Sequence, residues 1–186
     1  MNNLQVPPWF KSYPPNLSWK MAAVEKPAHH IFEDTALSHP DNPCLDFLNR
    51  KFTYAETLDL VDRFAAGMQK LGIKKGDRIG LCLPNCPYFV VAYYAILKIG
   101  ATVVNFNLLY TFREIEQQIL DSKISTMITI DLKPVYKKVE QCSLSTQLEK
   151  IIYCSLADML MPTQKYLFKI FQFYQIARIK KGVNKF

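Results

Sequence analysis

The residues most suited to acid–base or metal chemistry in this sequence are two adjacent histidines. His29 and His30 are followed one helical turn later by Glu33 and Asp34. Imidazoles and carboxylates at this spacing can transfer protons or bind a metal ion. Four such residues in a short polar helix are also typical of a solvated helix face. The solvated face is the interpretation that we take from the sequence, so we assign no metal-binding or acid–base role to these residues.

The cysteine pair Cys82 and Cys86, in the segment LCLPNC, is a second possible ligand set. Structural zinc sites usually have four nitrogen or sulfur ligands, and no histidine, His39 included, stands at a ligand spacing from this pair. We therefore expect both to be structural thiols. The sequence has five cysteines, an odd number, and opens with a polar, proline-rich stretch that does not resemble a secretory signal. These features are typical of free thiols in a reducing cytoplasm.

A phosphate-binding loop is the feature that an α/β nucleotide enzyme would need, and the sequence does not contain one. No two of the six glycines are closer than four positions, which excludes G-x-G-x-x-G. The nearest approach, Gly67 to Gly72, is followed by Ile73 where a phosphate loop has lysine, and it closes a helix. Neither H-E-x-x-H nor G-x-S-x-G occurs. We assign no catalytic, cofactor-binding or metal-binding residue.

The elements that would position any site alternate between helix and strand. Two capping boxes, Thr53 to Glu56 and Thr111 to Glu114, mark helix starts. The alternation predicts an α/β fold with a mostly parallel sheet flanked by helices. The predicted helices cover 27–38, 53–71, 87–99, 111–121 and 134–142; the predicted strands cover 78–83, 101–106, 125–131 and 149–155, with two short strands in 44–53 around a turn at Asn49-Arg50.

By composition the chain divides into three parts. Residues 1–26 form a proline-rich extended lead, 27–160 the α/β subdomain, and 161–186 a basic amphipathic helix and tail, in which the helix ends at Gly182. Six lysines and arginines and no acidic residue follow Asp158. Of the net charge of +7, only +1 therefore belongs to residues 1–158.

The basic residues of this tail alternate with aliphatic and aromatic ones, which does not favour nucleic-acid binding. The pattern favours packing of the helix against more protein, with contact between residues 163–181 and an anionic membrane surface as the alternative. The longest apolar run, 88–97, is shorter than the roughly 20 residues that span a bilayer.

A family resemblance is carried by residues 73–123, which include NFNLLYTFREIEQQILDSK. They resemble the N-terminal segment of the adenylate-forming, AMP-binding superfamily, and most closely the bacterial long-chain fatty acid–CoA ligases. Three further segments are similar to the same family, in the same order: WFKSYPP near the start, HPDNPCLDFLNRKFTYAET, and the basic stretch 165–182. Leu108 and Phe112 depart from the family at positions where it usually has proline.

The resemblance implies a two-step reaction. A complete enzyme of this kind uses ATP and magnesium to convert a fatty acid to an acyl-adenylate, and then transfers the acyl group to coenzyme A. The resemblance also implies that the family's phosphate loop, magnesium-binding glutamate, ribose-binding aspartate and C-terminal lysine lie beyond residue 186.

From this resemblance we expect a partial N-terminal subdomain of the adenylate-forming fold, from a truncated or split gene, that binds no cofactor and is inactive alone. The expected partner is the remainder of the ligase or a homodimer mate. The alternative function is a non-catalytic interaction module. The expected location is the cytoplasm, with peripheral contact to the inner face of the membrane as a further alternative.

Overall fold

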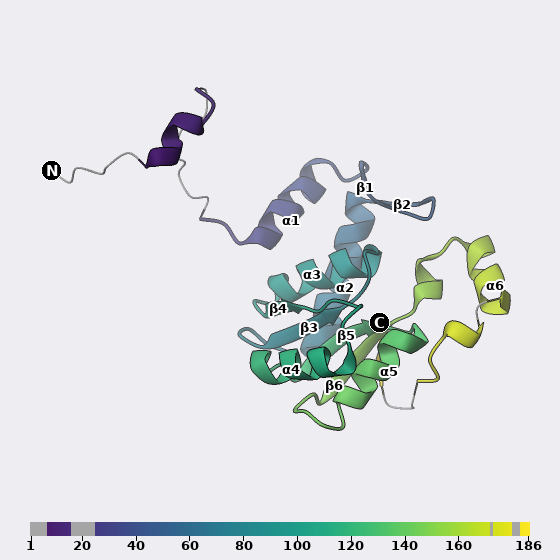
Figure 1. Cartoon of the computed structure of the whole chain (residues 1–186). Coiled ribbons are helices and arrows are strands. Elements are labelled where there is room, and N and C mark those ends of the chain that lie inside the picture. The colour runs from purple at the N-terminus through teal and green to yellow at the C-terminus, as the bar shows by residue number, and fades with distance from the viewer. Residues whose placement is uncertain (1–6, 16–24, 172, 180–182) are drawn as a thin grey trace.

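A computed structural model describes residues 7–15, 25–171, 173–179 and 183–186. In this part of the chain a five-stranded sheet lies between two layers of helices, and a two-stranded hairpin lies beside them (Figure 1). The strands of the sheet follow the order β4-β3-β5-β6-β7, and each neighbouring pair is parallel. The predicted α/β fold with a parallel sheet is confirmed.

The elements follow the predicted order along the chain. The strands are β1 (Pro43–Phe47), β2 (Arg50–Thr53), β3 (Arg78–Cys82), β4 (Thr102–Asn105), β5 (Thr126–Ile130), β6 (Lys150–Cys154) and β7 (Asn184–Lys185). The helices are α1 (Ala28–Ser38), α2 (Tyr54–Lys70), α3 (Pro87–Lys98), α4 (Phe112–Ser122), α5 (Lys133–Cys142) and α6 (Pro162–Phe171), with short 3-10 turns η1 (Pro8–Ser12), η2 (Leu156–Met159) and η3 (Phe173–Gln175). Among the described residues, no helix is both long and apolar enough to span a membrane.

Both predicted capping boxes are present. At the start of α2 the Thr53 hydroxyl accepts from the Glu56 amide at 3.1 Å, and the Glu56 carboxylate accepts from the Thr53 amide at 2.9 Å. At the start of α4 the Thr111 hydroxyl and the Glu114 carboxylate make the same exchange at 3.4 and 2.7 Å. Each box satisfies amides that have no partner inside the helix, which explains why both helices begin where the sequence predicted.

The hairpin differs from its prediction by one position. Leu48 and Asn49 form the turn, with φ of 51° and 67°, whereas the sequence pointed to Asn49-Arg50. Two successive residues at positive φ are the geometry of a type I′ turn, which matches the twist of a two-residue hairpin. Asparagine tolerates this conformation well and leucine does not, which is why the turn chemistry of Leu48 was not recognisable.

Helices cover both faces of the sheet. The first layer holds α1, α2 and α3, which pack on one another, and the second layer holds α4 and α5 (Figure 1). Because both faces are covered, the central strands are largely buried: all five residues of β5 are buried, including Thr126 and Thr129. Gly80 in β3 lies directly beside Met127 of β5. A methyl group at Gly80 would lie 2.5 Å from Cδ1 of Ile124, so this glycine permits a close approach.

The predicted C-terminal helix is wrong over its second half. The helix α6 ends at Phe171; residues 173–175 form a 3-10 turn, and residues 176–179 are not helical. Ile176 pairs with Leu132, and the Ala177 amide donates to the Asp131 carbonyl at 2.8 Å. These backbone partners and the burial of Ala177 outweigh the helical pattern of the sequence. The predicted helix end at Gly182 lies outside the described residues.

After the undescribed residues 180–182 the chain forms β7, a fifth parallel strand that the sequence did not predict. Residues 1–26 were predicted as an extended lead. Within them the structure describes the short turn η1, which begins after Pro7, and residues 1–6 and 16–24 lie outside the described part. Proline at the first turn position favours such a turn because it fixes φ.

Candidate functional site

The strand order places the natural ligand-binding position of the sheet between β3 and β5. From β3 the chain moves to β4 on one side, and it then crosses to β5 and β6 on the other. In open parallel sheets, ligands bind outside the carboxyl ends of the strands where the winding changes direction. The residues at this position are the loop after β3, which contains Asn85 and Cys86, and Asp131 at the end of β5.

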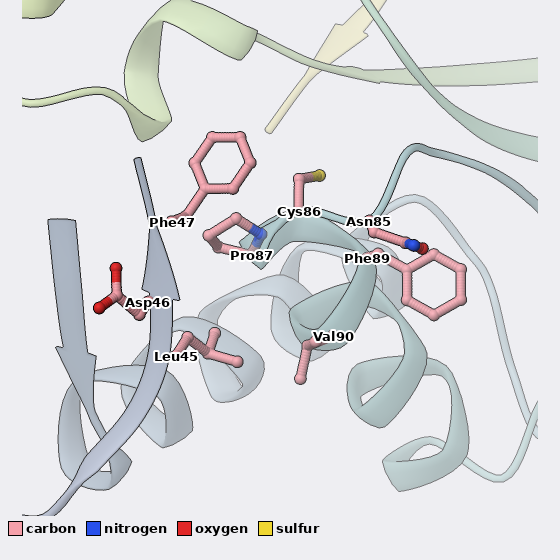
Figure 2. Close-up of a pocket in the computed structure, with 8 residues that line it drawn as sticks. All are labelled: Leu45, Asp46, Phe47, Asn85, Cys86, Pro87, Phe89 and Val90. Atoms are coloured by element: carbon pink, nitrogen blue, oxygen red, sulfur yellow. The ribbon is translucent and has the colours of Figure 1, made fainter. Parts of the chain in front are cut away.

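An apolar pocket of about 300 Å³ lies at the carboxyl end of β3 (Figure 2). Its lining comes from β1 and from the loop and first turns of α3: Leu45, Asp46, Phe47, Asn85, Cys86, Pro87, Phe89 and Val90. Leu45 points from β1 toward Val90, whereas Asp46 projects from the other side of the strand (Figure 2). Because the lining is mainly hydrocarbon, the pocket suits an apolar group better than a phosphate.

The carboxylate of Asp131 is buried and serves the backbone. It accepts from the Leu156 amide at 2.9 Å, and the Ser155 hydroxyl also donates to it. Burial raises the pKa of Asp131, and these hydrogen bonds only partly oppose the rise. Asp131 therefore fixes the turn that follows β6, and it is not one of the residues that line the pocket.

An ionic cluster around Asp158 gathers residues from four elements. The carboxylate accepts from Lys165 of α6 and from Lys185 of β7, each at 2.7 Å. Arg50 of β2 donates to the Asp158 carbonyl at 2.9 Å. Burial by itself would raise the pKa of Asp158, but the hydrogen bonds from the two lysines lower it overall. Two of the cations that make the tail basic thus share one carboxylate of the fold.

The loop between β4 and α4 is held rigidly at the same edge of the sheet. Lys138 of α5 donates to the carbonyls of Leu108 and Tyr110 at 2.9 and 2.6 Å. The Asn107 side chain accepts from the Leu109 amide at 3.0 Å. Leu108 and Tyr110 pack against the core, and Leu109 is 87% exposed. The loop therefore presents one leucine to the outside on a backbone that is fixed from both sides.

The structure places the candidate residues of the sequence in helix α1, around the end of β3, and in and after helix α2. His29, His30 and Glu33 lie close together, with their potential ligand atoms all within 4.8 Å of one another. Cys82 and Cys86 are free and buried, and burial raises the pKa of Cys82 to about 11. The glycines at 67 and 72 lie in and just after α2, so they do not form a phosphate loop.

Three residues with clear contacts were missed by the sequence analysis: Asp131, Lys138 and Asp158. A signal existed for Asp131, because it directly follows a buried strand at the carboxyl edge. No local pattern marked the partners of Lys138 or Asp158. The carbonyls that Lys138 binds lie 28 and 30 positions away in the sequence. One partner of Asp158 is Arg50, which is 108 positions away.

The sequence of this chain is similar to a known protein family and to known enzymes. The model of the family described as "AMP-binding enzyme" matches residues 32–169. The long-chain-fatty-acid–CoA ligase of Bacillus subtilis is 33% identical over 165 residues, which are 89% of this chain and 29% of that enzyme. The chain therefore spans less than a third of the length of this relative.

The structure of this chain also superposes on solved structures of ligases. Coronafacic acid ligase of Pectobacterium brasiliense superposes with a TM-score of 0.63 at 32% identity, over 67% of this chain and 25% of that one. A long-chain-fatty-acid-CoA ligase of Archaeoglobus fulgidus superposes with a TM-score of 0.65 at 19% identity, over 72% of this chain and 28% of that one. The parallel sheet and its helices thus match part of adenylate-forming enzymes.

Proposed function

Because this chain belongs to the AMP-binding enzyme family, we propose that it supplies the first α/β subdomain of a long-chain fatty acid–CoA ligase. The observation that carries the proposal is the similarity to the Bacillus subtilis ligase over 89% of this chain. In the proposed reaction the carboxylate of the fatty acid attacks the α-phosphorus of ATP and pyrophosphate leaves. The thiol of coenzyme A then displaces AMP from the acyl-adenylate.

In this proposal the described residues act as a scaffold. Stabilising the charge on the phosphates in the transition state needs several aligned donors or a cation. The charged groups at the carboxyl edge already have internal partners: Lys138 binds loop carbonyls, and Lys165 and Lys185 bind Asp158. This pairing supports binding of ATP, magnesium and coenzyme A by other parts of a complete enzyme, and inactivity of residues 1–186 alone.

A chimera tests the proposed family activity. Residues 32–169 would replace the matching segment of the Bacillus subtilis ligase, and exchange of ATP with labelled pyrophosphate would be measured with and without palmitate. We expect palmitate-dependent exchange in the chimera and none with residues 1–186 alone. A chimera that is monodisperse and folded by circular dichroism but has no exchange would contradict the proposal, and exchange by the isolated chain would contradict its inactivity.

A docking role for the apolar pocket follows from the same proposal. Leu45, Phe47, Phe89 and Val90 line an open hollow at the carboxyl end of β3, the side on which open parallel sheets bind their ligands. We propose that the remainder of the ligase covers it. The expected result is that the amides of Asn85, Cys86 and residues 88–90 are protected from hydrogen exchange in the chimera, relative to the isolated chain. Equal exchange in both would count against the proposal.

A second proposal is that residues 163–181 contact an anionic membrane surface. Tyr166 and Leu167 of α6 are exposed, which suits an interface. Lys165, however, is paired with Asp158, which reduces the charge available to anionic lipids. Flotation with anionic vesicles, with and without residues 163–186, tests the proposal: unchanged flotation after the deletion would contradict it.

A further inference from the structure

The N-terminal half of α1 brings three metal-ligating side chains together. Glu33 follows His29 by four residues and His30 by three, so one carboxylate lies on the helix face next to both imidazoles. The potential ligand atoms of the three residues lie within 4.8 Å of one another, and all three side chains are half-buried. The two imidazole rings meet edge to face, with centroids 4.4 Å apart.

A cation already occupies the acidic side of this cluster. The ammonium group of Lys98, which reaches across from α3, lies 2.8 Å from the Glu33 carboxylate and 2.5 Å from the Asp62 carboxylate of α2. Burial opposes the charge on Lys98, but the two carboxylates outweigh it and raise the pKa of the lysine. Glu33 and Asp62 thus stabilise the charge of Lys98 between helices α1, α2 and α3, and a metal ion at Glu33 has to take the place of this ammonium group.

We propose that His29, His30 and Glu33 bind one divalent transition-metal ion of the zinc or nickel type, which displaces the Lys98 ammonium from Glu33. Two imidazoles and one carboxylate are the donor set that such ions prefer, whereas magnesium and calcium prefer oxygen donors alone. This site is separate from the proposed ligase reaction, and neither depends on the other.

The geometry requires only a small rearrangement of side chains. Zinc lies about 2.0–2.1 Å from imidazole nitrogens, so ligand atoms up to 4.8 Å apart must move inward somewhat around a shared ion. The backbone need not move, because the three residues share one helix. Lys98 keeps a partner when it leaves Glu33, since Asp62 also accepts from it at 2.5 Å.

The chain contains its own matched control. His39 is the third histidine and lies just after the last residue of α1, outside the cluster. Zinc binding would be measured by isothermal titration calorimetry on the full chain, in a Cys44→Ser background that removes the one described cysteine that is not buried. Cobalt absorption provides a second readout, because thiolate ligands give an intense near-ultraviolet band that imidazole ligands do not.

The expected result is one zinc ion per chain and a cobalt spectrum without the thiolate band. His30→Ala and Glu33→Gln should each weaken binding by about tenfold or more, since even partners outside the ligand shell change metal affinity by 10–100-fold. His39→Ala should leave the affinity unchanged. Lys98→Gln should tighten binding, because it removes the competing ammonium, whereas a purely structural lysine would give the opposite result or none.

The proposal is overturned by several outcomes. These are the absence of saturable zinc binding, an equal loss of affinity in His39→Ala and His30→Ala, a cobalt spectrum with the thiolate band, or weaker binding after Lys98→Gln in a chain that circular dichroism shows to be folded. His29→Gln serves as a second ligand variant that keeps a polar side chain of similar size, in case an alanine variant fails to fold.

Discussion

The close packing around Gly80 in the central strand leads to a quantitative prediction. A Cβ atom at this position would lie 2.5 Å from Cδ1 of Ile124 and 2.6 Å from the sulfur of Met127. Carbon atoms in contact are normally about 3.5–4.0 Å apart, so each overlap is on the order of 1 Å. Both neighbouring side chains are 0% exposed, so that any shift of their ends has to be accommodated inside the core. We expect Gly80→Ala to destabilise the fold by about 1–3 kcal/mol, the usual cost of overpacking a core.

Gly67 provides the matched control for this substitution. It lies in α2, and a Cβ atom there would meet nothing within 4 Å. Because alanine is a better helix former than glycine, Gly67→Ala should stabilise the chain by about 0.5–1 kcal/mol. The same change of residue type is thus predicted to have opposite signs at two positions. Urea unfolding followed by far-ultraviolet circular dichroism measures both, with the slope of the transition as a check on two-state behaviour.

A double-mutant cycle then tests the proposed cause. Ile124→Val removes the Cδ1 methyl group that the new Cβ would meet, at a cost of about 0.5–1.5 kcal/mol by itself. In combination with Gly80→Ala it should restore part of the lost stability, so the double variant should be less destabilised than the sum of the single variants. The rescue is partial because the contact with Met127 remains. Additive effects, or a Gly80→Ala chain within about 0.5 kcal/mol of the original, would refute the reasoning.

Three further predictions concern a buried acid, a thiol and a helix cap. Since burial raises the pKa of Asp131 above its unfolded value, the stability that this group contributes is complete at low pH and declines as pH rises from about 4 through the raised pKa. Asp131→Asn should therefore gain stability relative to the original chain as pH rises. Asp131→Ala should lose about 1–3 kcal/mol, because the Leu156 amide is left without its acceptor. Denaturant titrations at several pH values measure both effects, and a stability difference between Asp131→Asn and the original chain that does not change with pH would contradict the argument. Cys44 is half-buried and the other four cysteines are buried, so a thiol reagent should label Cys44 first in the folded chain. Cys44→Ser should remove the fast phase of the labelling reaction, and a fast phase that persists in this variant would contradict the prediction. Thr111→Ala should cost about 0.5–2 kcal/mol through loss of the cap of α4, and a thermal midpoint unchanged from that of the original chain would contradict it.

The fold was largely predictable where the controlling signals are local. The capping box at Thr53 and the apolar stripe that follows it fixed α2, and the alternation of elements indicated a parallel sheet. The strand order was not predictable, because it depends on which strand β3 pairs with on each side. The prediction for the C-terminal segment was wrong for a related reason. Ile176 and Ala177 lie in a helical sequence pattern, but they pair through the backbone with Leu132 and Asp131, which no local pattern reveals.

The candidate site shows the same division. The sequence marked His29, His30 and Glu33 as neighbours along a helix, and a solvated face was a reasonable interpretation of them. It could not reveal Lys98, which comes from another helix and pairs with Glu33. The ionic cluster of Asp158 was likewise invisible, because Arg50 reaches it from 108 positions earlier in the chain.

The place of β3 in the sheet has a consequence for folding during synthesis. β3 is the first strand of the sheet to leave the ribosome, and it is hydrogen-bonded on both sides in the finished structure. Its partner β4 follows after one helix, so that side can close early. The other side must wait until residues 126–130 have been made, and pairing of this kind between distant segments is slow. A nascent chain that has reached α4 therefore carries an open, apolar strand edge, and this is the stage at which it most needs protection from aggregation.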